Sequence, residues 1–204
     1  GPIANPKEMN FSWEQAIEIL KTDAFYVQNF QLAYSDGLTI QNMRKAIVSF
    51  EESLLTPNSR FDQFLKGDKT AITESELSGY QLFKKYGCIS CHQGVSVGGN
   101  SYQKFSTVGN YFEDRGNITE VDYGRFVITN KEQDRFVFKV PSLRNVELTA
   151  PYFHDGSQKT LIDAVNIKIK YQLGRLPKGN DAELIVAFLK TLTGQYQGKL
   201  LKGR

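Results

Sequence analysis

The two cysteines of the chain are separated by two residues and are followed directly by a histidine, in the order Cys88-Ile89-Ser90-Cys91-His92. This spacing is the attachment signature of c-type haem. The two thiols form thioethers with the two vinyl groups of one porphyrin, and the histidine binds the iron from one side. Because such a haem is a large apolar plate against which irregular backbone can pack, this motif constrains the fold more than any other feature.

Three other interpretations of the motif are weaker. A structural zinc site needs four nitrogen or sulfur ligands, and the only other histidine is His154. A thioredoxin-like redox pair expects a preceding strand within a βαβ unit, whereas a helical pattern precedes Cys88. A disulfide between Cys88 and Cys91 would close too short a loop to stabilise much. We therefore expect one covalent haem c, and with it a periplasmic location, because covalent haem attachment normally takes place outside the cytoplasm.

Composition adds only broad limits. The chain has 204 residues, 40% of them hydrophobic and 23% charged, which is average for a soluble globular protein. The length fits one domain, or one domain with a sizeable extension. A formal charge of +3 without a clustered basic stripe gives no indication of nucleic-acid binding. The longest apolar run, residues 184–189, is far shorter than the roughly 20 residues of a transmembrane helix, so no transmembrane segment is expected.

The first residues, GPIANP, have neither the basic start nor the apolar stretch of a signal peptide. Two explanations fit a periplasmic protein with such a start. Either a leader has been removed, or the chain is a piece of a longer protein.

Most of the chain has the apolar spacing of amphipathic helices. Helices are predicted after a capping box at Ser12 and Gln15, at residues 24–34, at 40–54 with Pro57 as the stop, at 60–65, after a capping box at Thr73 and Glu76, and at 160–169 and 181–193. Residues 94–135 are rich in glycine and lack a sustained helical period, which predicts a long loop that wraps the haem. A short strand is predicted at residues 135–140. The expected fold is therefore mainly α, a cytochrome c-like haem domain with a long wrapping loop and little β structure.

Several longer motifs resemble a known family, the bacterial dihaem cytochrome c peroxidases and the related MauG-type enzymes. The stretches that carry this resemblance are GPIANPKEM (1–9), GGNSYQKF (98–105), FKVPSLRNVELTAPYFHDG (138–156), YQLG (171–174) and IVAFL (185–189). They cover essentially the whole chain.

The resemblance concerns the later part of the family pattern. Family members carry a first haem motif in an N-terminal domain, where peroxide is cleaved, and a second motif for an electron-transfer haem. Residues 88–92 resemble the second motif, and the sequence contains no first motif. The chain is thus similar either to the C-terminal part of a dihaem enzyme, whose N-terminal peroxidatic haem domain would be a partner, or to a natural single-haem relative. The implied domains are a helical linking segment at residues 1–70 and a c-type cytochrome domain at residues 71–204.

The resemblance also implies roles for individual residues. Glu8 matches the acidic residue above the peroxidatic haem, a general acid/base for O–O cleavage; outside that setting it would be a solvated carboxylate. Thr149 and Pro151 match backbone carbonyls that help to bind a calcium ion between the two domains, with a further side-chain ligand from the absent domain. His154 matches a histidine near the haem edge, where a structural role fits better than that of a ligand.

One departure from the family pattern concerns the iron. The electron-transfer haem usually has a methionine as distal ligand, at the fourteenth residue after the histidine of the PYFHDG motif, and here that residue is Lys168. The loss of His/Met ligation is therefore predicted. One hypothesis is that the neutral amine of Lys168 binds the iron opposite His92 and lowers the reduction potential. The alternatives are a solvent-facing lysine with five-coordinate or water-bound iron, or ligation by Tyr171 or His154.

Three functions remain open at this stage. The first is the electron-transfer haem domain of a peroxidase that reduces hydrogen peroxide to water, with a small cytochrome c or a cupredoxin as electron donor. Lys84 and Lys85 could steer an acidic donor, although a solvated helix face is the simpler interpretation. The second is a stand-alone monohaem electron carrier, and the third is a MauG-like oxidase of a protein substrate. A homodimer is a further expected assembly.

Overall fold

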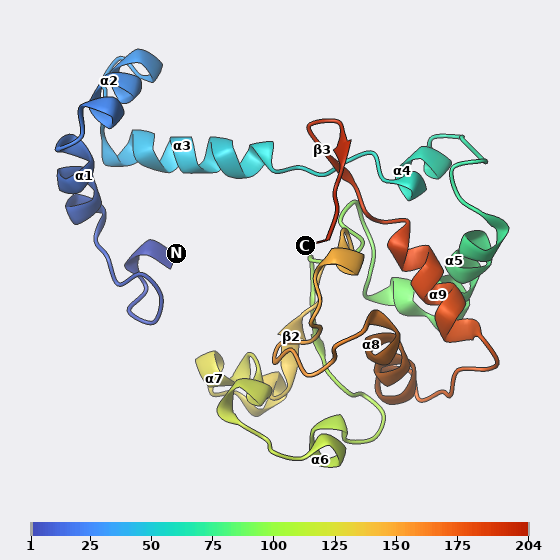
Figure 1. Cartoon of the computed structure of the whole chain (residues 1–204). Helices are drawn as coiled ribbons and strands as arrows, with labels where there is room; N and C mark the ends of the chain where they lie inside the picture. The colour runs from blue at the N-terminus through green and yellow to red at the C-terminus, as the bar shows by residue number, and fades with distance from the viewer. Residues whose placement is uncertain (1, 204) are drawn as a thin grey trace. The chain divides into compact units, whose positions relative to one another are not determined.

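The computed structural model describes residues 2–203, and the chain divides into two compact units after Leu55 (Figure 1). Helices dominate both units, and the four strands found among the described residues are two or three residues long. The prediction of a mainly α fold with little β structure is confirmed. None of the helices in residues 2–203 has the length and apolar character that crossing a bilayer would require.

The first unit contains three helices, α1 (Trp13–Lys21), α2 (Ala24–Ala33) and α3 (Ile40–Ser53). The capping box predicted at Ser12 and Gln15 is confirmed: Gln15 N donates to Ser12 Oγ at 3.0 Å, and Ser12 N donates to Gln15 Oε1 at 2.9 Å. Each helix thus begins at a residue whose side chain accepts a backbone N–H, and Asp23 and Thr39 do the same for α2 and α3.

The interior of this first unit is small. Its buried residues among those described are Ile17, Gly37, Asn42 and Met43, and α2 contributes none. Asn42 is held inside because its amide donates to Asp36 Oδ1 at 2.7 Å and to the Gly37 carbonyl at 2.8 Å. The apolar faces of α2 and α3 therefore remain largely exposed within the described chain.

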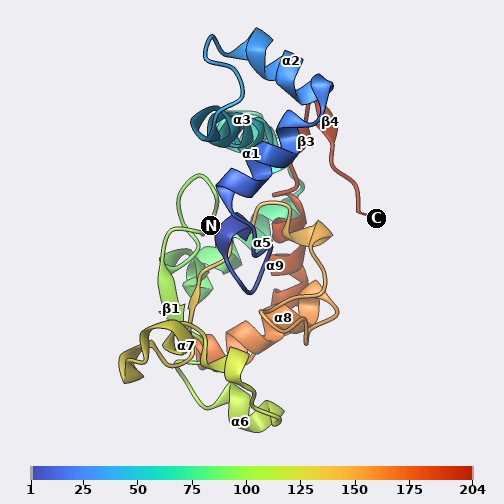
Figure 2. The same cartoon turned by 90° about the vertical axis from the view of Figure 1, so that its left-hand side faces the viewer.

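The second unit is built around α5 (Glu74–Tyr86) and α9 (Asp181–Lys190), which lie side by side in both views (Figures 1 and 2). The short helix α4 (Arg60–Leu65) supplies Phe61, whose ring is 5.0 Å from that of Phe188 and 4.9 Å from that of Tyr80. The capping box predicted at Thr73 and Glu76 is confirmed. The first core cluster of this unit consists of Phe61, Phe83, Tyr86, Leu143, Val146, Ile169, Ala182, Ile185, Phe188, Leu189 and Leu192.

Gly79 allows α5 and α9 to approach closely. A Cβ atom at this position would lie 1.9 Å from the carbonyl oxygen of Leu184, a backbone atom that cannot move aside cheaply. The helix pair that leads into the haem motif therefore depends on a glycine in the middle of α5.

We expect Gly79→Ala to destabilise the protein by about 1–3 kcal/mol, because the added methyl overpacks the helix contact. Helix propensity alone predicts the opposite sign, a gain of about 1 kcal/mol. Thermal unfolding, with the exposed Ser78→Ala of the same helix as the control, measures the difference. A melting temperature of Gly79→Ala above that of the wild type would contradict the close approach of α5 and α9 at Gly79.

The wrapping loop expected at residues 94–135 contains short elements that its sequence pattern did not predict. They are β1 (Tyr102–Lys104), α6 (Tyr111–Arg115), α7 (Phe126–Thr129) and 3-10 turns at Glu120–Tyr123 and Glu132–Asp134. β1 pairs antiparallel with β2 (Val137–Lys139), the predicted strand in shorter form, with Gln103 opposite Phe138. These elements are too short for a period to show in the sequence, because few residues in each face the interior.

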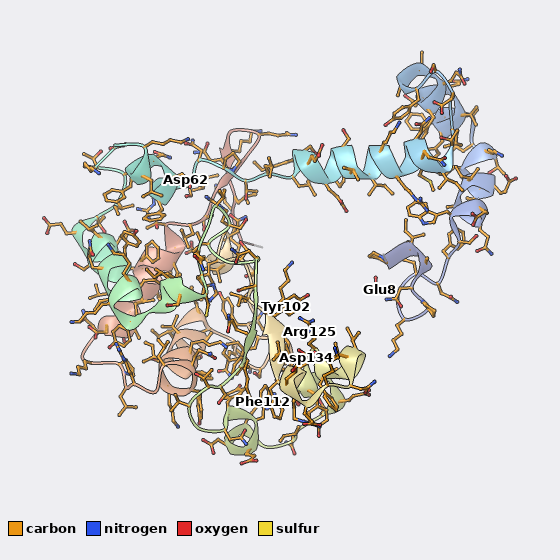
Figure 3. All side chains as sticks on the ribbon, turned by 180° about the vertical axis from the view of Figure 1, so that it is seen from behind. Glu8, Asp62, Tyr102, Phe112, Arg125 and Asp134 are labelled. Carbon is orange, nitrogen blue, oxygen red and sulfur yellow. The ribbon has the colours of Figure 1, made fainter. Side chains whose placement is uncertain are left out.

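A second core cluster holds this loop together. Phe105, Tyr111, Phe112 and Tyr171 are buried in it, and Phe136, Phe138, Phe153 and Ile167 pack against it. Close to β2, the Arg125 guanidinium lies 5.1 Å from the Tyr102 ring centroid and 3.5 Å from Asp134 Oδ2 (Figure 3). Aromatic packing and charge contacts thus replace long secondary structure here.

The helix predicted at residues 160–169 changes its character near its end. α8 (Leu161–Ile167) passes directly into a π-helical turn, Lys168–Gln172, in which Leu173 N donates to the Lys168 carbonyl at 3.3 Å. Further 3-10 turns lie at Pro2–Ala4, Cys88–Ser90 and Val146–Leu148, and the strands β3 (Gln195–Tyr196) and β4 (Lys199–Leu200) form a hairpin. A single π-helical turn often marks a functional site.

The boundary after Leu55 lies earlier in the chain than the domain boundary expected after residue 70. The family domains at residues 1–70 and 71–204 stay a prediction. In the structure α4 belongs to the second unit, because Phe61 N donates to the Thr191 carbonyl and Arg144 binds Asp62 with two hydrogen bonds of 2.8 and 2.9 Å.

Candidate haem site

The predicted attachment motif forms one tight turn at the end of α5. The helix ends at Gly87, which has a φ of 91° and so reverses the chain in a conformation that favours glycine. Cys91 N and His92 N then both donate to the Cys88 carbonyl, at 3.3 and 3.0 Å. Both cysteines are free thiols. A single turn therefore presents two thiols and one imidazole together, as covalent haem attachment requires.

The orientation of His92 leaves one ring nitrogen available. Nδ1 lies 3.3 Å from the Val97 carbonyl oxygen, which can only accept, so Nδ1 carries the proton and Nε2 keeps a free lone pair. Gly98 makes this close packing of the ring against the backbone possible, because a Cβ there would lie 2.2 Å from the Pro141 carbonyl oxygen and 3.0 Å from Nδ1. Burial lowers the pKa of His92, and the nearby Lys168 charge lowers it further, so the neutral imidazole that binds a metal is favoured.

Lys168 extends into an aromatic environment close to the motif. Its Nζ lies 3.2 Å from the centroid of the Phe105 ring and 5.5 Å from that of Phe153. Burial lowers the pKa of Lys168 from 10.5 to about 7, while the charge of Cys91 opposes this shift. Burial therefore favours the neutral amine, which is the form that a metal ligand must have.

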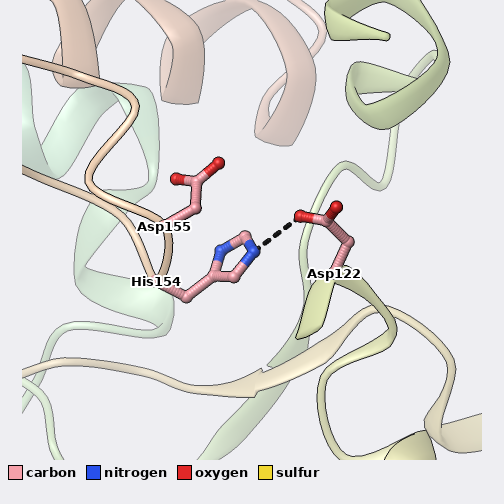
Figure 4. Close-up of side chains that lie close together, drawn as sticks. All are labelled: Asp122, His154 and Asp155. Atoms are coloured by element: carbon pink, nitrogen blue, oxygen red, sulfur yellow. Dashed lines mark hydrogen bonds and ion pairs between the residues drawn. The ribbon is translucent and has the colours of Figure 1, made fainter. Parts of the chain in front are cut away.

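The two other candidate iron ligands have partners elsewhere. Tyr171 donates its hydroxyl to Asp114 Oδ2 at 2.7 Å. His154 Nε2 lies 2.7 Å from Asp122 Oδ1 (Figure 4), and its ring packs 4.5 Å from that of Phe138. Of these three side chains within residues 2–203, only that of Lys168 makes no hydrogen bond or ion pair.

Asp122, His154 and Asp155 come close enough to resemble a metal site, since one ligand atom of each lies within 4.8 Å of the others. Arg115 already neutralises this group: its Nη2 lies 2.7 Å from Asp122 Oδ2, and its Nη1 contacts Asp155. The cluster therefore acts as a charge network that ties the wrapping loop to the PYFHDG turn. This agrees with a structural role for His154.

The same network gives the loop a pH dependence. Burial by itself raises the pKa of Asp122, but hydrogen bonds from Arg115, from Thr119 N and from His154 outweigh it and hold this pKa far below its usual range. The pKa of Asp122 is lower in the folded chain than in the unfolded chain, where it is about 3.9. Ionised Asp122 therefore stabilises the fold at pH values above this unfolded pKa, and the stabilisation is lost as the pH falls below it.

We expect Asp122→Asn to cost about 3–5 kcal/mol at neutral pH, because it leaves Arg115 partly unpaired in a buried setting. The melting temperature of the variant should also fall less steeply than that of the wild type below about pH 4. Thermal unfolding as a function of pH measures both effects, with the exposed pair variant Glu132→Gln as control. An equal loss of stability in Asp122→Asn and Glu132→Gln would contradict a special role for Asp122.

The structure also describes the remaining predicted site residues, each within its own unit. Glu8 lies in the first unit, is exposed, and accepts a hydrogen bond from Asn5 at 2.8 Å (Figure 3). Thr149 and Pro151 are exposed, and their carbonyl oxygens accept no backbone or side-chain hydrogen bond from the described residues. In the last turn of α5, Lys85 is exposed, whereas the Lys84 amine lies 4.4 Å from the Tyr80 ring centroid.

Residues 88–92 fit the group that the motif predicts. The donors are two free thiols and an imidazole with one free nitrogen, and Cys88 packs against the first core cluster, where burial raises the pKa of its thiol to about 11. A haem held there would find apolar side chains from both core clusters.

Comparison with known proteins identifies the family. A family model described as di-haem cytochrome c peroxidase matches residues 1–70. The chain is 48% identical to the cytochrome c551 peroxidase of Nitrosomonas europaea over 95% of its own length, and 42% identical to the cytochrome c peroxidase Ccp of Escherichia coli over 96%. The chain belongs to the family of dihaem cytochrome c peroxidases and MauG proteins. Membership in this peroxidase family implies haem c, in agreement with the motif.

The fold agrees with this family. A MauG-like protein, described as associated with microbial copper homeostasis, superimposes with a TM-score of 0.75 and 26% identity, over 93% of this chain and 65% of that one. The chain spans 57% of the length of the Nitrosomonas peroxidase and 42% of that of the Escherichia peroxidase. Any activity of a whole family member is therefore a proposal for this chain.

The sequence did not single out every residue at the site. Val97 and Gly98 orient His92, and Phe105 lies beneath the Lys168 amine. Gly98 and Phe105 belong to the GGNSYQKF motif, which resembles the family but by itself indicates no role for either residue. The feature of the sequence that could have indicated their role is a glycine pair followed by an aromatic residue within the predicted wrapping loop.

Proposed function

We propose that this chain is the electron-transfer haem c portion of a periplasmic dihaem cytochrome c peroxidase, which reduces hydrogen peroxide to water. The observation that carries the proposal is the Cys88–His92 turn with Nε2 of His92 free, in a chain that is similar to peroxidases over 95% of its length. A small cytochrome c or a cupredoxin is the proposed electron donor.

The residues of this chain would bind and orient the cofactor. Cys88 and Cys91 would hold one haem by two thioethers, and His92 would bind its iron while Val97 fixes the imidazole. When bound, the haem supplies a one-electron redox centre. The exposed Lys85 next to the motif offers a positive charge to an acidic donor, which would mainly raise the association rate.

We propose Lys168 as the distal iron ligand. Its amine lies close enough to His92 and Cys91 for their charges to interact, and its burial favours the neutral form. The other two candidate ligands are held elsewhere, because Tyr171 binds Asp114 and His154 binds Asp122. An amine is a harder ligand than a thioether and favours ferric iron, so this haem would have a lower potential than one with His/Met ligation.

The proposed peroxidatic haem would lie in a further domain, for which the first unit offers a surface. Large apolar side chains on α2 and α3 are exposed, including Phe25, Leu32 and Phe50 at 66, 86 and 61%. Such a patch commonly marks an interface. In that complete protein Glu8 would serve as general acid/base, and the carbonyls of Thr149 and Pro151 would contribute to a calcium site between the domains.

Haem counting and peroxide turnover test this proposal. The pyridine haemochrome of the purified protein, together with its intact mass, gives the number of haems per chain. Peroxide consumption with a reduced small cytochrome then tests for the enzyme, and it is expected only when the peroxidatic domain is present. Rapid reduction of the haem by the donor without any turnover, even in the longest natural polypeptide, would instead favour a stand-alone electron carrier.

A MauG-like oxidase of a protein side chain is the second candidate. Two observations favour it: a structural neighbour is described as MauG-like, and the residue at the proposed distal position is not methionine. Oxidation of a protein substrate by peroxide, in the absence of a reduced cytochrome, would distinguish this activity from peroxide reduction.

A further inference from the structure

The side-chain amide of Gln172 binds both peptide groups that flank Phe105. Ser106 N donates to Gln172 Oε1 at 3.0 Å, and Gln172 Nε2 donates to the Lys104 carbonyl at 3.1 Å. Phe105 N in turn donates to the Phe136 carbonyl at 2.8 Å. The backbone of Phe105 is therefore fixed on both sides by one side chain from the π-helical turn, 66 to 68 positions away in the sequence.

Phe105 is in turn the ring over which the Lys168 amine lies. It is 7% exposed, and its centroid lies 5.1 Å from that of Phe153 and 5.4 Å from that of Phe112, so its neighbours leave it little freedom. The Lys168 Nζ lies 3.2 Å from its centroid. A displaced Phe105 would remove the surface against which the amine rests.

The π-helical turn links Lys168 and Gln172 into one rigid piece. These residues are the first and last of the turn, which Leu173 N closes by donating to the Lys168 carbonyl. Backbone carbonyls of the turn also accept two hydrogen bonds from the wrapping loop: Thr107 Oγ1 donates to the Gln172 carbonyl at 2.7 Å, and Val108 N donates to the Tyr171 carbonyl at 2.9 Å. The loop that carries Phe105 and the turn that carries Lys168 therefore move together.

We propose that Gln172 is a positioning residue, which through Phe105 holds the Lys168 amine at the place where it binds the haem iron. This inference rests on the proposed ligation by Lys168. Gln172 itself touches neither the amine nor the motif in any hydrogen bond of the described chain. Its effect is to reduce the number of arrangements open to the Phe105 backbone, so that less conformational entropy is lost when the amine binds.

Competition with an added ligand tests this role without measuring catalysis. Imidazole binds ferric haem only where the distal amine gives way, so its affinity reports how firmly Lys168 is held. The haem-loaded wild type is compared with Gln172→Ala and with Gln172→Glu, which keeps the size of the side chain but cannot donate to the Lys104 carbonyl. Gln103→Ala, an exposed glutamine of the same loop, is the matched control.

We expect both Gln172 variants to bind imidazole about tenfold more tightly than the wild type, which corresponds to about 1.4 kcal/mol. The low-spin signal of the lysine-bound ferric form should decrease in parallel in electron paramagnetic resonance, and Gln103→Ala should match the wild type. If Gln172→Ala fails to fold, as circular dichroism will show, Gln172→Glu decides the question.

A Lys168→Ala variant separates the two proposals. If it binds imidazole more tightly than the wild type while the folded Gln172 variants do not, the positioning role of Gln172 is wrong and lysine ligation stands. If Lys168→Ala binds imidazole with unchanged affinity, the amine does not occupy the distal position, and both proposals fall.

Discussion

Replacement of both Cys88 and Cys91 by alanine is expected to abolish covalent haem attachment. The thioethers of this motif require the two thiols, and these are the only cysteines of the chain. The variant should retain no haem after denaturing electrophoresis, and its intact mass should equal that of the bare polypeptide. Because a haem would pack against both core clusters, the variant should also melt at a lower temperature than the haem-bound wild type.

The single variants Cys88→Ala and Cys91→Ala are the controls for this loss. Each keeps one thiol on the same turn, so each should keep a haem through one thioether, and the haemochrome spectrum should show one vinyl group unreacted. Haem that survives denaturation in the double variant would place the attachment elsewhere and remove the basis of the proposed function.

Lys168→Met is expected to raise the reduction potential of the haem by on the order of 0.1 V, a fraction of the roughly 0.8 V range that axial ligands control. A thioether stabilises ferrous iron relative to an amine, and the variant restores the residue that the family usually has at this position. The ferric spectrum should gain the weak far-red band of methionine-bound haem. A redox titration followed by absorption measures the shift.

Lys170→Met is the matched control for this substitution. Lys170 lies two residues further along the same π-helical turn, but it is exposed and its amine lies 3.0 Å from the Tyr171 hydroxyl. Its replacement should leave the potential and the ferric spectrum unchanged. Equal spectra for the wild type and Lys168→Met would show that Lys168 does not bind the iron.

The sequence by itself determined the features that depend on a few neighbouring residues. The haem motif forms a single turn, in which Cys91 N and His92 N both donate to the Cys88 carbonyl. The capping boxes at Ser12 and Thr73 lie within four residues each, and both are present in the structure. The distance of fourteen residues from His154 to Lys168 also needed no structure, since it is read directly from the sequence.

Only the tertiary structure decided how the distal side of the site is arranged. The sequence leaves Tyr171 and His154 open as alternatives to Lys168, but Asp114 and Asp122, from the wrapping loop, bind these two side chains. Gln172 reaches Lys104 and Ser106 across more than sixty residues of chain. Such contacts depend on the path of a loop built from elements three to five residues long, and no periodic pattern in the sequence encodes that path.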